Sequence, residues 1–375
     1  MVGRRQMVGA VGAGLAAAIL SGVAPAALQG TGRRARQDGR MGYAIVGLGN
    51  YGTRQIMPSF VHSRNARIAA LVSGTPAKLE RYGAEYDVPT THRYSYQDFD
   101  RIRDNPDIDI VYVVLPVSMH AEYSIRASRA GKHVMCEKPM AMSAVECQSM
   151  IDAATAADRQ LMIGYRSRFE PNNIHAIALA RSGRIGAHRV FDSQHGFAAS
   201  LQSGWRLDRS MSGGGSMMDI GIYGLNAARY MLGEEPTEVI AMDATDRTDP
   251  RFRTVEDRLL STLRFPSGAV AQLVSSYSSH HNRYRLSGAD GFIDADPGTP
   301  YEGQRLRLKA GDEDVRDVTR PVGPREQFAG QLDHLPTAIR EGRRNIVPGE
   351  EGLADIRIIE AMYRSAAERQ PVRLA

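Results

Sequence analysis

The pattern of apolar and polar residues changes once along the chain, near residue 165. Before this point, short apolar runs alternate with longer segments of helical periodicity. Such runs are typical of strands that are buried on both faces of a parallel sheet. Their alternation with helices of this length predicts βαβ units in a doubly wound sheet. We expect strands at 43–49, 67–74, 108–116, 132–139 and 159–165, and helices at 51–60, 76–87, 120–131 and 143–158.

After residue 165, apolar and polar residues alternate one by one over longer runs. This period of two, with turns such as FPSG at 265–268, predicts a largely antiparallel sheet. We expect strands at 188–196, 237–246, 257–265, 269–279, 284–296 and 304–310, and helices at 215–232, 325–342 and 349–369. The chain is therefore predicted to be an α/β protein with two domains, at 42–164 and 165–375.

The first 41 residues do not follow either pattern. Residues 1–26 combine a charged start, a weakly apolar run and the small residues APA, which predicts a secretory signal that is cleaved after Ala26. The pair Arg4–Arg5 favours twin-arginine export to the periplasm, although Met7 stands where phenylalanine is common. A signal anchor is the alternative, but a run rich in Gly and Ala is poorly apolar for a membrane span. We expect residues 27–41 to form an extended arm, with no stable membrane insertion after cleavage.

The charge of the chain is concentrated at its start. The formal net charge is +5, and residues 1–40 carry six arginines and one aspartate, which account for all of it. The rest of the chain is neutral on balance, which argues against nucleic acid as a partner. The two cysteines, Cys136 and Cys147, do not have the spacing of a metal motif. We expect two buried free thiols rather than a disulfide bridge, and no bound metal.

A glycine motif follows the first predicted strand. GLGNYG at 47–52 fits G-x-G-x-x-G and lies between a strand and a helix, which is the context that a dinucleotide site requires. Gly47 allows a tight turn, Gly49 lets the main chain approach a pyrophosphate, and Gly52 lets the helix pack against the sheet. The phosphates then lie at a helix N-terminus. A plain glycine turn is the alternative reading.

The end of the second strand indicates which dinucleotide is bound. NAD enzymes usually carry an Asp or Glu there, but this strand ends in LVSG, with Ser73 in that place. A hydroxyl can donate to a 2′-phosphate, whereas a carboxylate would repel it. Lys78 and Arg54 are close enough in the sequence to add positive charge. We therefore predict NADP rather than NAD, while Lys78 as a solvated helix residue remains the alternative.

Two further segments carry candidate catalytic groups. Lys138 lies at the end of the strand expected at 132–139, so it is expected at the carboxyl edge of the sheet, where ligands of such folds bind. Asp219 and Tyr223 are four residues apart and would share one face of a helix. A nearby ammonium group favours the phenolate form of a tyrosine. Lys138 and Tyr223 are thus a candidate pair for moving the proton of a sugar hydroxyl, although Tyr223 in isolation reads as a core residue.

Five segments in this order resemble one family: GLGNYG, LPVSMHAE, GKHVMCEKPMA, MIGYR and GGGSMMDIGIYGLN. The chain is similar from about residue 42 to its end to the glucose-fructose oxidoreductase, inositol dehydrogenase and rhizopine-catabolism family. The twin-arginine signal, the arm, VSG after the second strand and Tyr223 resemble the periplasmic glucose-fructose oxidoreductase subgroup. Many other members carry histidine at the place of Tyr223. The resemblance implies a Rossmann domain followed by an α/β domain with a large, mainly antiparallel open sheet.

The resemblance also implies roles for individual residues. Lys138 and Tyr223 would be the catalytic pair, with Asp219 orienting the sugar. Trp205 and Arg206 would lie over the nicotinamide region, although a single tryptophan is as often a core residue. The cofactor contacts would be Gly47, Leu48, Gly49, Asn50, Tyr51, Gly52, Ser73, Lys78, Tyr96, Leu115, Pro116, His120, Glu137, Lys138, Arg166, Trp205, Arg206 and Tyr301.

The implied activity is the oxidation of one sugar to its lactone and the reduction of a second sugar by the same tightly held NADP. The resemblance also implies that the open sheet mediates the contacts of a homodimer or homotetramer. The segment QHGFAASLQSGW at 194–205 departs from the glucose-fructose pattern and is expected to border the sugar pocket, so a different pair of sugars is an open alternative. Aldose–aldose oxidoreductases are similar in motif and accept other sugars. An ordinary NADP-dependent sugar dehydrogenase or reductase with exchangeable cofactor is the alternative. A non-catalytic sugar- or nucleotide-sensing protein is a third reading, because a fold alone does not prove activity.

Overall fold

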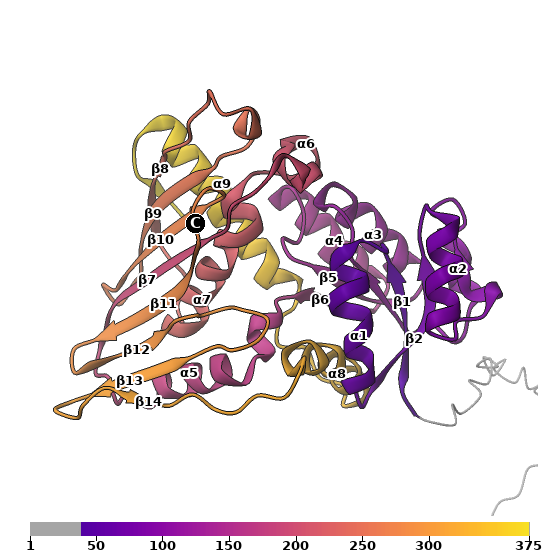
Figure 1. Ribbon diagram of the computed structural model, residues 1–375, viewed down its shortest axis with the longest axis horizontal. Coiled ribbons are helices and arrows are strands. Elements are labelled where there is room, and N and C mark those ends of the chain that lie inside the picture. The colour runs from indigo at the N-terminus through magenta and orange to yellow at the C-terminus, as the bar shows by residue number, and fades with distance from the viewer. Residues whose placement is uncertain (1–38, 375) are drawn as a thin grey trace, which may run out of the picture. The chain divides into compact units, whose positions relative to one another are not determined.

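A computed structural model describes residues 39–374. The predicted signal at 1–26 and all but the last residues of the predicted arm at 27–41 lie outside this range. The described chain forms two β-sheets with helices packed around and between them (Figure 1). The confirmed fold class is therefore α/β, with one parallel sheet and one mainly antiparallel sheet.

The first sheet has six strands in the order β3-β2-β1-β4-β5-β6, and all of its strand pairs are parallel. Every residue of β1, β4 and β6 is buried, as expected of apolar runs covered on both faces. β3 was not predicted because two residues carry no periodic pattern. The strands are β1 (Met41–Val46), β2 (Ala66–Val72), β3 (Arg93–Tyr94), β4 (Ile110–Val113), β5 (His133–Glu137) and β6 (Leu161–Gly164).

The helices that connect these strands lie close to their predicted positions. They are α2 (Pro76–Glu85), α3 (His120–Arg129) and α4 (Ala144–Ala156). The helix expected at 51–60 is divided into a π-turn η1 (Gly52–Ile56), α1 (Met57–Ser59) and a 3₁₀ turn η2 (Phe60–His62). Pro58 has no N–H to donate inside this segment, which interrupts a regular helix. Other short 3₁₀ turns are η3 (Thr90–His92), η4 (Phe99–Asp104), η5 (Val117–Met119), η6 (Arg166–Phe169) and η9 (Pro250–Phe252).

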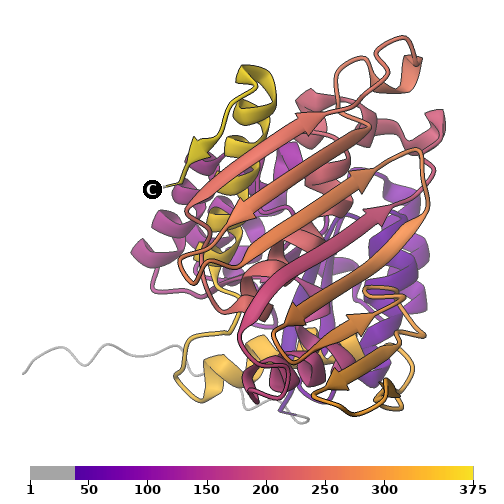
Figure 2. The same ribbon diagram turned by 90° about the vertical axis from the view of Figure 1, so that its left-hand side faces the viewer.

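The second sheet has nine strands in the order β14-β13-β12-β11-β7-β10-β9-β8-β15, and only the β7–β10 pair is parallel. The run expected at 284–296 is two strands joined at Ala289–Asp290. The strands are β7 (His188–Gly196), β8 (Glu238–Asp243), β9 (Arg258–Arg264), β10 (Val270–Ser276), β11 (His281–Gly288), β12 (Gly291–Ala295), β13 (Leu306–Ala310), β14 (Arg316–Asp317) and β15 (Val372–Arg373). Figure 2 shows one face of this sheet with no described helix in front of it.

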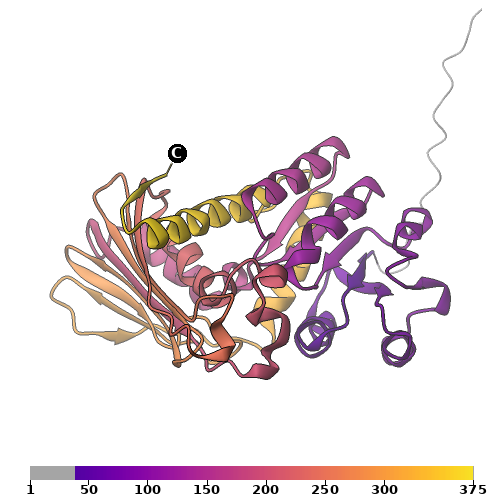
Figure 3. The same cartoon turned by 90° about the horizontal axis from the view of Figure 1, so that it is seen from above.

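The helices of the second half lie on the other face of the nine-stranded sheet, toward the six-stranded sheet (Figure 3). They are α5 (Pro171–Arg181), α6 (Arg209–Ser212), α7 (Ile222–Leu232), α8 (Glu326–Arg340) and α9 (Gly349–Glu368), with a 3₁₀ segment η7 (Leu201–Leu207) and a π-turn η8 (Met217–Gly221). The helix α5 was not predicted, because its buried face includes asparagines as well as alanine and leucine. The side chain of Glu170 caps it by accepting from the N–H of Asn173 at 2.6 Å.

Buried polar contacts join the two halves of the described chain. Asp355 on α9 is fully buried and accepts from Tyr165 after β6 at 2.6 Å and from Arg229 on α7 at 2.8 Å. Burial raises the pKa of Asp355, while the Arg229 guanidinium acts in the opposite direction. α9 therefore packs against both sheets through a hydrogen-bonded network. Within residues 39–374, none of the helices combines the length and apolar character needed to cross a bilayer.

Cys136 on β5 and Cys147 on α4 are both buried and unpaired, which confirms the prediction of two free thiols. Burial raises the pKa of both thiols, for Cys147 to about 12. The two thiols thus remain protonated at neutral pH and behave as small apolar groups in the core.

Candidate active site

A cleft of about 1090 Å³ lies at the carboxyl edge of the six-stranded sheet. One wall of the cleft is formed by residues that follow the ends of β1, β2, β4, β5 and β6. The other wall is formed by segments of the second half of the chain. All residues predicted for the site except Arg54 line the cleft. They are Gly47, Leu48, Gly49, Asn50, Tyr51, Gly52, Ser73, Lys78, Tyr96, Leu115, Pro116, His120, Glu137, Lys138, Arg166, Trp205, Arg206, Asp219, Tyr223 and Tyr301.

The glycine motif forms the turn between β1 and η1. Gly47 has φ +102°, and a Cβ there would lie 2.3 Å from the carbonyl oxygen of Val114. A Cβ on Gly52 would lie 2.8 Å from the carbonyl oxygen of Gly47. At Gly49 a Cβ would meet no protein atom within 4 Å. Two glycines are therefore required by the protein itself, while the space at Gly49 is open for a ligand that approaches the main chain.

The end of β2 supplies hydroxyl and ammonium groups. Ser73 is buried, and its Oγ accepts from the N–H of Thr75 at 3.2 Å. Lys78 Nζ donates to the carbonyl oxygen of Leu48 at 2.9 Å, which places the ammonium group beside the glycine turn. This arrangement fits a 2′-phosphate, since no carboxylate of residues 39–374 lines the cleft at this end. The expectation for Arg54 was wrong: it is exposed on η1 and does not line the cleft.

His120 joins two strand ends beneath the cleft. Its Nδ1 lies 2.9 Å from the carbonyl oxygen of Pro139, and its Nε2 lies 2.9 Å from that of Leu115. Burial lowers the pKa of His120, since the charged imidazolium loses its hydration. On the adjoining wall, the ring of Tyr96 packs against Gly74, where a Cβ would lie only 3.1 Å from the ring.

Lys138, Asp219 and Tyr223 come together at the other end of the cleft. Lys138 Nζ donates to the main-chain oxygen of Asp219, lies 3.5 Å from its Oδ1, and lies 4.8 Å from the centre of the Tyr223 ring. Asp219 Oδ2 also accepts from Arg206 Nε and from the Tyr277 hydroxyl, both at 3.1 Å. The predicted amine and phenol therefore lie in contact, although they are far apart in the sequence.

The charge state of Asp219 is set by its cationic neighbours. Burial alone would raise the pKa of Asp219, but the Lys138 ammonium and the Arg206 guanidinium outweigh it and lower that pKa. Asp219 is thus a carboxylate at neutral pH that holds both cations in the cleft.

Arg166 also lies against the ring of Tyr223. Its guanidinium carbon is 4.7 Å from the centre of the Tyr223 ring and 4.6 Å from that of Tyr301, so the cation lies against both rings. It donates to the carbonyl oxygen of Thr299 at 2.8 Å and to Gln327 Oε1 at 2.6 Å. Burial is the main cause that raises the pKa of Tyr301 to about 12, and the neighbouring Tyr223 acts in the same direction. Tyr301 is therefore a neutral hydroxyl in this wall.

Glu137, which precedes Lys138, is a buried acid in the floor of the cleft. Glu137 Oε1 accepts from the Tyr112 hydroxyl. The hydroxyl oxygen of Tyr112 in turn accepts from Gln331 Nε2 at 2.7 Å. Burial raises the pKa of Glu137 to about 7, even though the Tyr112 hydrogen bond and the Lys138 charge act in the opposite direction. A proton-exchanging group therefore lies next to the candidate catalytic amine.

The glycine run before Asp219 is explained by close packing. A Cβ on Gly215 would lie 2.0 Å from the carbonyl oxygen of Glu256. The Glu256 side chain is buried and accepts from the N–H of Gly215 at 2.7 Å, the N–H of Met217 at 2.9 Å and the Tyr363 hydroxyl at 2.9 Å. It thereby satisfies N–H groups at the start of η8 and fixes the segment that carries Asp219 and Tyr223. Asp219 itself lies in the π-turn η8, whereas a regular helix was expected.

Several lining residues were not predicted. Gly74, Thr75, Val114 and Val117 adjoin predicted positions, and Thr299 and Pro300 directly precede Tyr301, so their neighbourhood was a usable signal. Phe197 and Gln202 lie in the segment 194–205, which was expected to border the sugar pocket, and Asn282 lies on β11 with no motif around it. The sequence did not decide whether Trp205 lies in the cleft or in the core. In the structure it is half-buried in the cleft wall.

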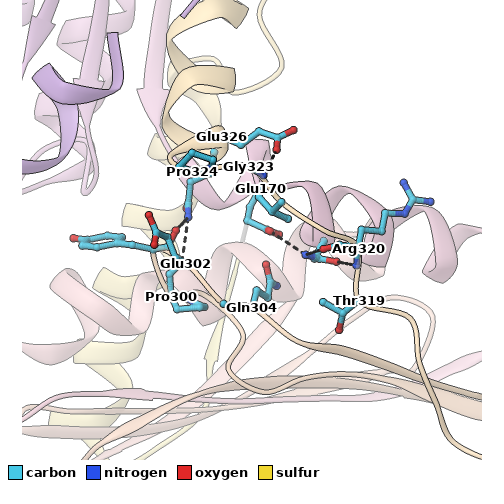
Figure 4. A pocket seen from close by; sticks show the side chains of 14 residues that line it. Glu170, Pro300, Glu302, Gln304, Thr319, Arg320, Gly323, Pro324 and Glu326 are labelled. Atoms are coloured by element: carbon cyan, nitrogen blue, oxygen red, sulfur yellow. Dashed lines mark hydrogen bonds between the residues drawn. The ribbon is translucent and has the colours of Figure 1, made fainter. Parts of the chain in front are cut away.

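A second hollow of about 360 Å³ shares Pro300 and Tyr301 with the cleft (Figure 4). Its lining is mixed polar and apolar and includes Glu302, which Figure 4 shows beside Pro300. Gln327 also lines it and donates to the carbonyl oxygens of Pro300 and Tyr301. The hollow thus lies behind the wall that carries Tyr301, and its side chains brace that wall.

The chemistry that this site permits is proton transfer beside a bound dinucleotide. The ammonium of Lys138, the phenol of Tyr223 and the carboxylate of Asp219 can handle the proton of an alcohol. Among residues 39–374, no group of three or more His, Cys, Asp or Glu side chains is placed to hold a metal ion.

Relatives of the chain support this reading. A D-xylose 1-dehydrogenase (NADP(+)) of Haloferax volcanii is 30% identical, over 89% of this chain and 100% of the relative. An inositol 2-dehydrogenase of Rhizobium meliloti is 25% identical, over 89% of this chain and 99% of the relative. The crystal structure of an aldose–aldose oxidoreductase from Caulobacter crescentus complexed with glycerol is 54% identical, with a TM-score of 0.87 over 89% of this chain and 100% of that chain.

Two family models match consecutive parts of the chain. Residues 41–165 match the model described as oxidoreductase family, NAD-binding Rossmann fold. Residues 178–374 match the model described as oxidoreductase family, C-terminal alpha/beta domain. Both models belong to one family, and together they span nearly all of the described chain. The chain belongs to the Gfo/Idh/MocA oxidoreductase family.

Proposed function

We propose that the protein is an NADP-dependent sugar oxidoreductase that oxidises an aldose to its lactone and reduces a second sugar with the same retained cofactor. The observation that carries this proposal is the contact of Lys138 with Asp219 and with the ring of Tyr223 in the cleft that also holds the glycine motif. The 54% identity to an aldose–aldose oxidoreductase supports the class of substrate.

The groups at the end of β2 support NADP as the cofactor. Ser73, Thr75 and Lys78 offer hydroxyl groups and an ammonium group there. The open space at Gly49 suits a pyrophosphate against the main chain. When bound, the nicotinamide supplies the site that accepts and returns a hydride.

The roles of the protein side chains follow from their contacts. Tyr223 takes the proton of the sugar hydroxyl while the hydrogen on the same carbon leaves as hydride. Lys138 stabilises the negative charge on the phenol oxygen during this transfer, and Asp219 holds Lys138 through its main-chain and side-chain oxygens. In the reductive half-reaction, Tyr223 returns the proton to the oxygen of the second sugar. Both halves therefore use the same three side chains in opposite directions.

Export is part of the proposal. A periplasmic enzyme has no free NADPH pool to draw on, so a cofactor that is loaded before export and never released would sustain turnover. The twin-arginine pair Arg4–Arg5 is the sequence feature that favours this route. We also propose that the uncovered face of the nine-stranded sheet (Figure 2) is the contact surface of a homodimer or homotetramer.

The test uses protein purified without added cofactor. Adding an aldose to desalted protein is expected to raise the absorbance near 340 nm in a single turnover, and adding a second sugar is expected to reverse it. Loss of the cofactor on desalting would reject retention. A desalted protein that turns over an aldose only when NADP is supplied would instead support the alternative, an ordinary NADP-dependent sugar dehydrogenase. The identity to a D-xylose 1-dehydrogenase favours that second candidate.

A further inference from the structure

We propose that Asn282 determines sugar specificity by donating a hydrogen bond from its side-chain Nδ2 to one hydroxyl oxygen of the bound sugar. The inference rests on the proposed function and makes it more specific, because it assigns one donor to one sugar hydroxyl. Asn282 lies on β11, lines the cleft and is half-buried.

The orientation of the Asn282 amide is fixed by a main-chain donor. One end of the amide lies 2.7 Å from the N–H of Thr299 and 3.0 Å from its Oγ1. A main-chain N–H can only donate, so the atom facing it must be the amide oxygen rather than the NH₂ group. The main-chain oxygen of Asn282 also accepts from the N–H of Gly298 at 2.7 Å. Asn282 therefore holds the turn before Tyr301 at two points.

The other end of the amide is a donor without a protein partner. Both hydrogen bonds of the side chain engage Oδ1, and Nδ2 donates to no protein atom in the described part of the chain. Nδ2 is also not among the buried atoms that lack a partner, so it keeps access to solvent in the cleft wall. An amide nitrogen with two hydrogens and a fixed direction is suited to a hydroxyl oxygen.

A buried histidine, His195, supports this orientation of the Asn282 amide through the Thr299 hydroxyl. His195 is the cross-strand neighbour of Asn282, and its Nε2 lies 3.0 Å from Thr299 Oγ1. Because the Thr299 hydroxyl donates to Asn282, it must accept from His195, which places the proton on Nε2. Burial, with the nearby Arg166 charge, lowers the pKa of His195 to about 3, so the ring is neutral. The hydrogen bonds thus run in one direction, from His195 through Thr299 to Asn282.

The same network lies next to the candidate catalytic group. The ring of His195 is stacked on that of Tyr223, with centroids 6.3 Å apart. Phe197, two residues beyond His195, also lines the cleft and packs edge-on against Tyr277. An apolar ring and a fixed N–H donor together match a sugar, which has C–H faces and equatorial hydroxyls. Asn282 is therefore placed to select a hydroxyl on the substrate rather than to take part in the proton transfer.

The test compares an aldose with its monodeoxy derivatives. The wild-type protein is expected to lose at least tenfold in kcat/KM with one of these derivatives, because the donor is then left unpaired. Asn282→Asp keeps an oxygen toward Thr299 but replaces the donor by an acceptor. It is expected to lower kcat/KM for the parent sugar about tenfold or more and to abolish the discrimination against that derivative. Asn282→Ala, which removes the side-chain amide and with it the donor, is the second variant.

Gln148→Glu is the matched control, since it makes the same amide-to-carboxylate change at an exposed position on α4. It is expected to keep the wild-type discrimination. A wild-type protein that turns over aldoses but distinguishes no monodeoxy derivative overturns the inference alone. The same holds if the variants fold and keep the wild-type ratio. A wild-type protein that turns over no aldose, with or without added NADP, instead rejects the proposed function on which the inference rests.

Discussion

The two walls of the cleft are built in different ways. The wall from the six-stranded sheet consists of groups that follow strand ends directly, such as Gly47 after β1, Ser73 after β2 and Lys138 after β5. Its geometry is set by the main chain. The wall from the second half consists of Asp219, Tyr223 and other groups from separate segments. Their positions depend on buried side-chain hydrogen bonds, above all those of Glu256.

This difference teaches where each wall is vulnerable. The first wall is sensitive to added atoms, because its glycine turn leaves no space for a Cβ at Gly47 or Gly52. The second wall is sensitive to lost or misplaced hydrogen-bond partners, because an unsatisfied buried polar group is costly. Substitutions in each wall therefore separate these two kinds of sensitivity.

The largest effect is expected where the walls meet. Lys138→Ala removes the amine that contacts Asp219 and the ring of Tyr223. We expect turnover to fall about 10³-fold, within the range typical of lost acid–base assistance, while cofactor retention largely survives. Single-turnover absorbance at 340 nm measures the first quantity, and the absorbance of the desalted protein measures the second.

Arg101→Ala is the control for this variant, since Arg101 is an exposed cation on η4 and does not line the cleft. It is expected to keep wild-type turnover. Undiminished turnover of Lys138→Ala would contradict the role given to that lysine.

The steric sensitivity of the first wall is tested by two alanines. Gly47→Ala adds a Cβ 2.3 Å from a carbonyl oxygen at φ +102°, and we expect a loss of about 3 kcal/mol in the free energy of unfolding. Gly49→Ala meets no protein atom, so its stability is expected to change by less than about 0.5 kcal/mol. Its cofactor retention should nevertheless fall, because the Cβ enters the space assigned to the pyrophosphate. Equal stability losses in a urea titration would show that the two glycines do not differ.

The floor of the cleft is expected to make stability depend on pH. Burial raises the pKa of Glu137 from 4.5 to about 7. Between these values the native state keeps a proton that the unfolded state loses, so the free energy of unfolding falls as the pH rises. The Glu137 contribution across this window is on the order of 3 kcal/mol at most. Urea unfolding at several pH values should show a weaker dependence in Glu137→Gln; an unchanged dependence would exclude Glu137 as its source.

The smallest effect is expected in the hydrogen bonds of the second wall. Both carboxylate oxygens of Glu256 accept from main-chain N–H groups, so either orientation of a glutamine would turn its NH₂ against a donor. We expect Glu256→Gln to lose about 2 kcal/mol and to raise KM for the sugar. Glu360→Gln is the control, because Glu360 is exposed and accepts from only one N–H, that of Ala144. If both variants are equally stable, the buried hydrogen bonds do not hold this wall.

The ease of prediction from the sequence differs in the same way. The strands at 43–49 and 108–116 were recognisable because both faces are buried, which leaves a continuous apolar run. β3 and β15 are two residues long and gain their strand character only from pairing with a neighbour. α5 was missed because its buried asparagines, Asn172 and Asn173, accept hydrogen bonds from distant segments, from Arg320 and Tyr284. Local patterns do not carry such contacts.

The candidate site shows the same limit. Gly47, Ser73 and Lys138 were found because each stands at a fixed offset from a strand end. Asp219 and Tyr223 were found through a glycine-rich motif and a family resemblance. Asn282 carries no signal of either kind, because its importance comes from the register that places it opposite His195 and from the turn at Thr299. Arg54 shows the converse, since closeness in sequence did not bring it into the cleft.

The attachment of Lys138 to Asp219 also bears on how such enzymes could be recombined. The amine comes from the first half of the chain, and its acceptors come from the second. A chimera that joins the first half of this chain to the second half of a distant homologue would combine Lys138 with an acceptor segment whose position was not selected to contact it. We expect such chimeras to fold with normal melting temperatures but to be inactive. Activity would return only through substitutions at the interface between the two halves.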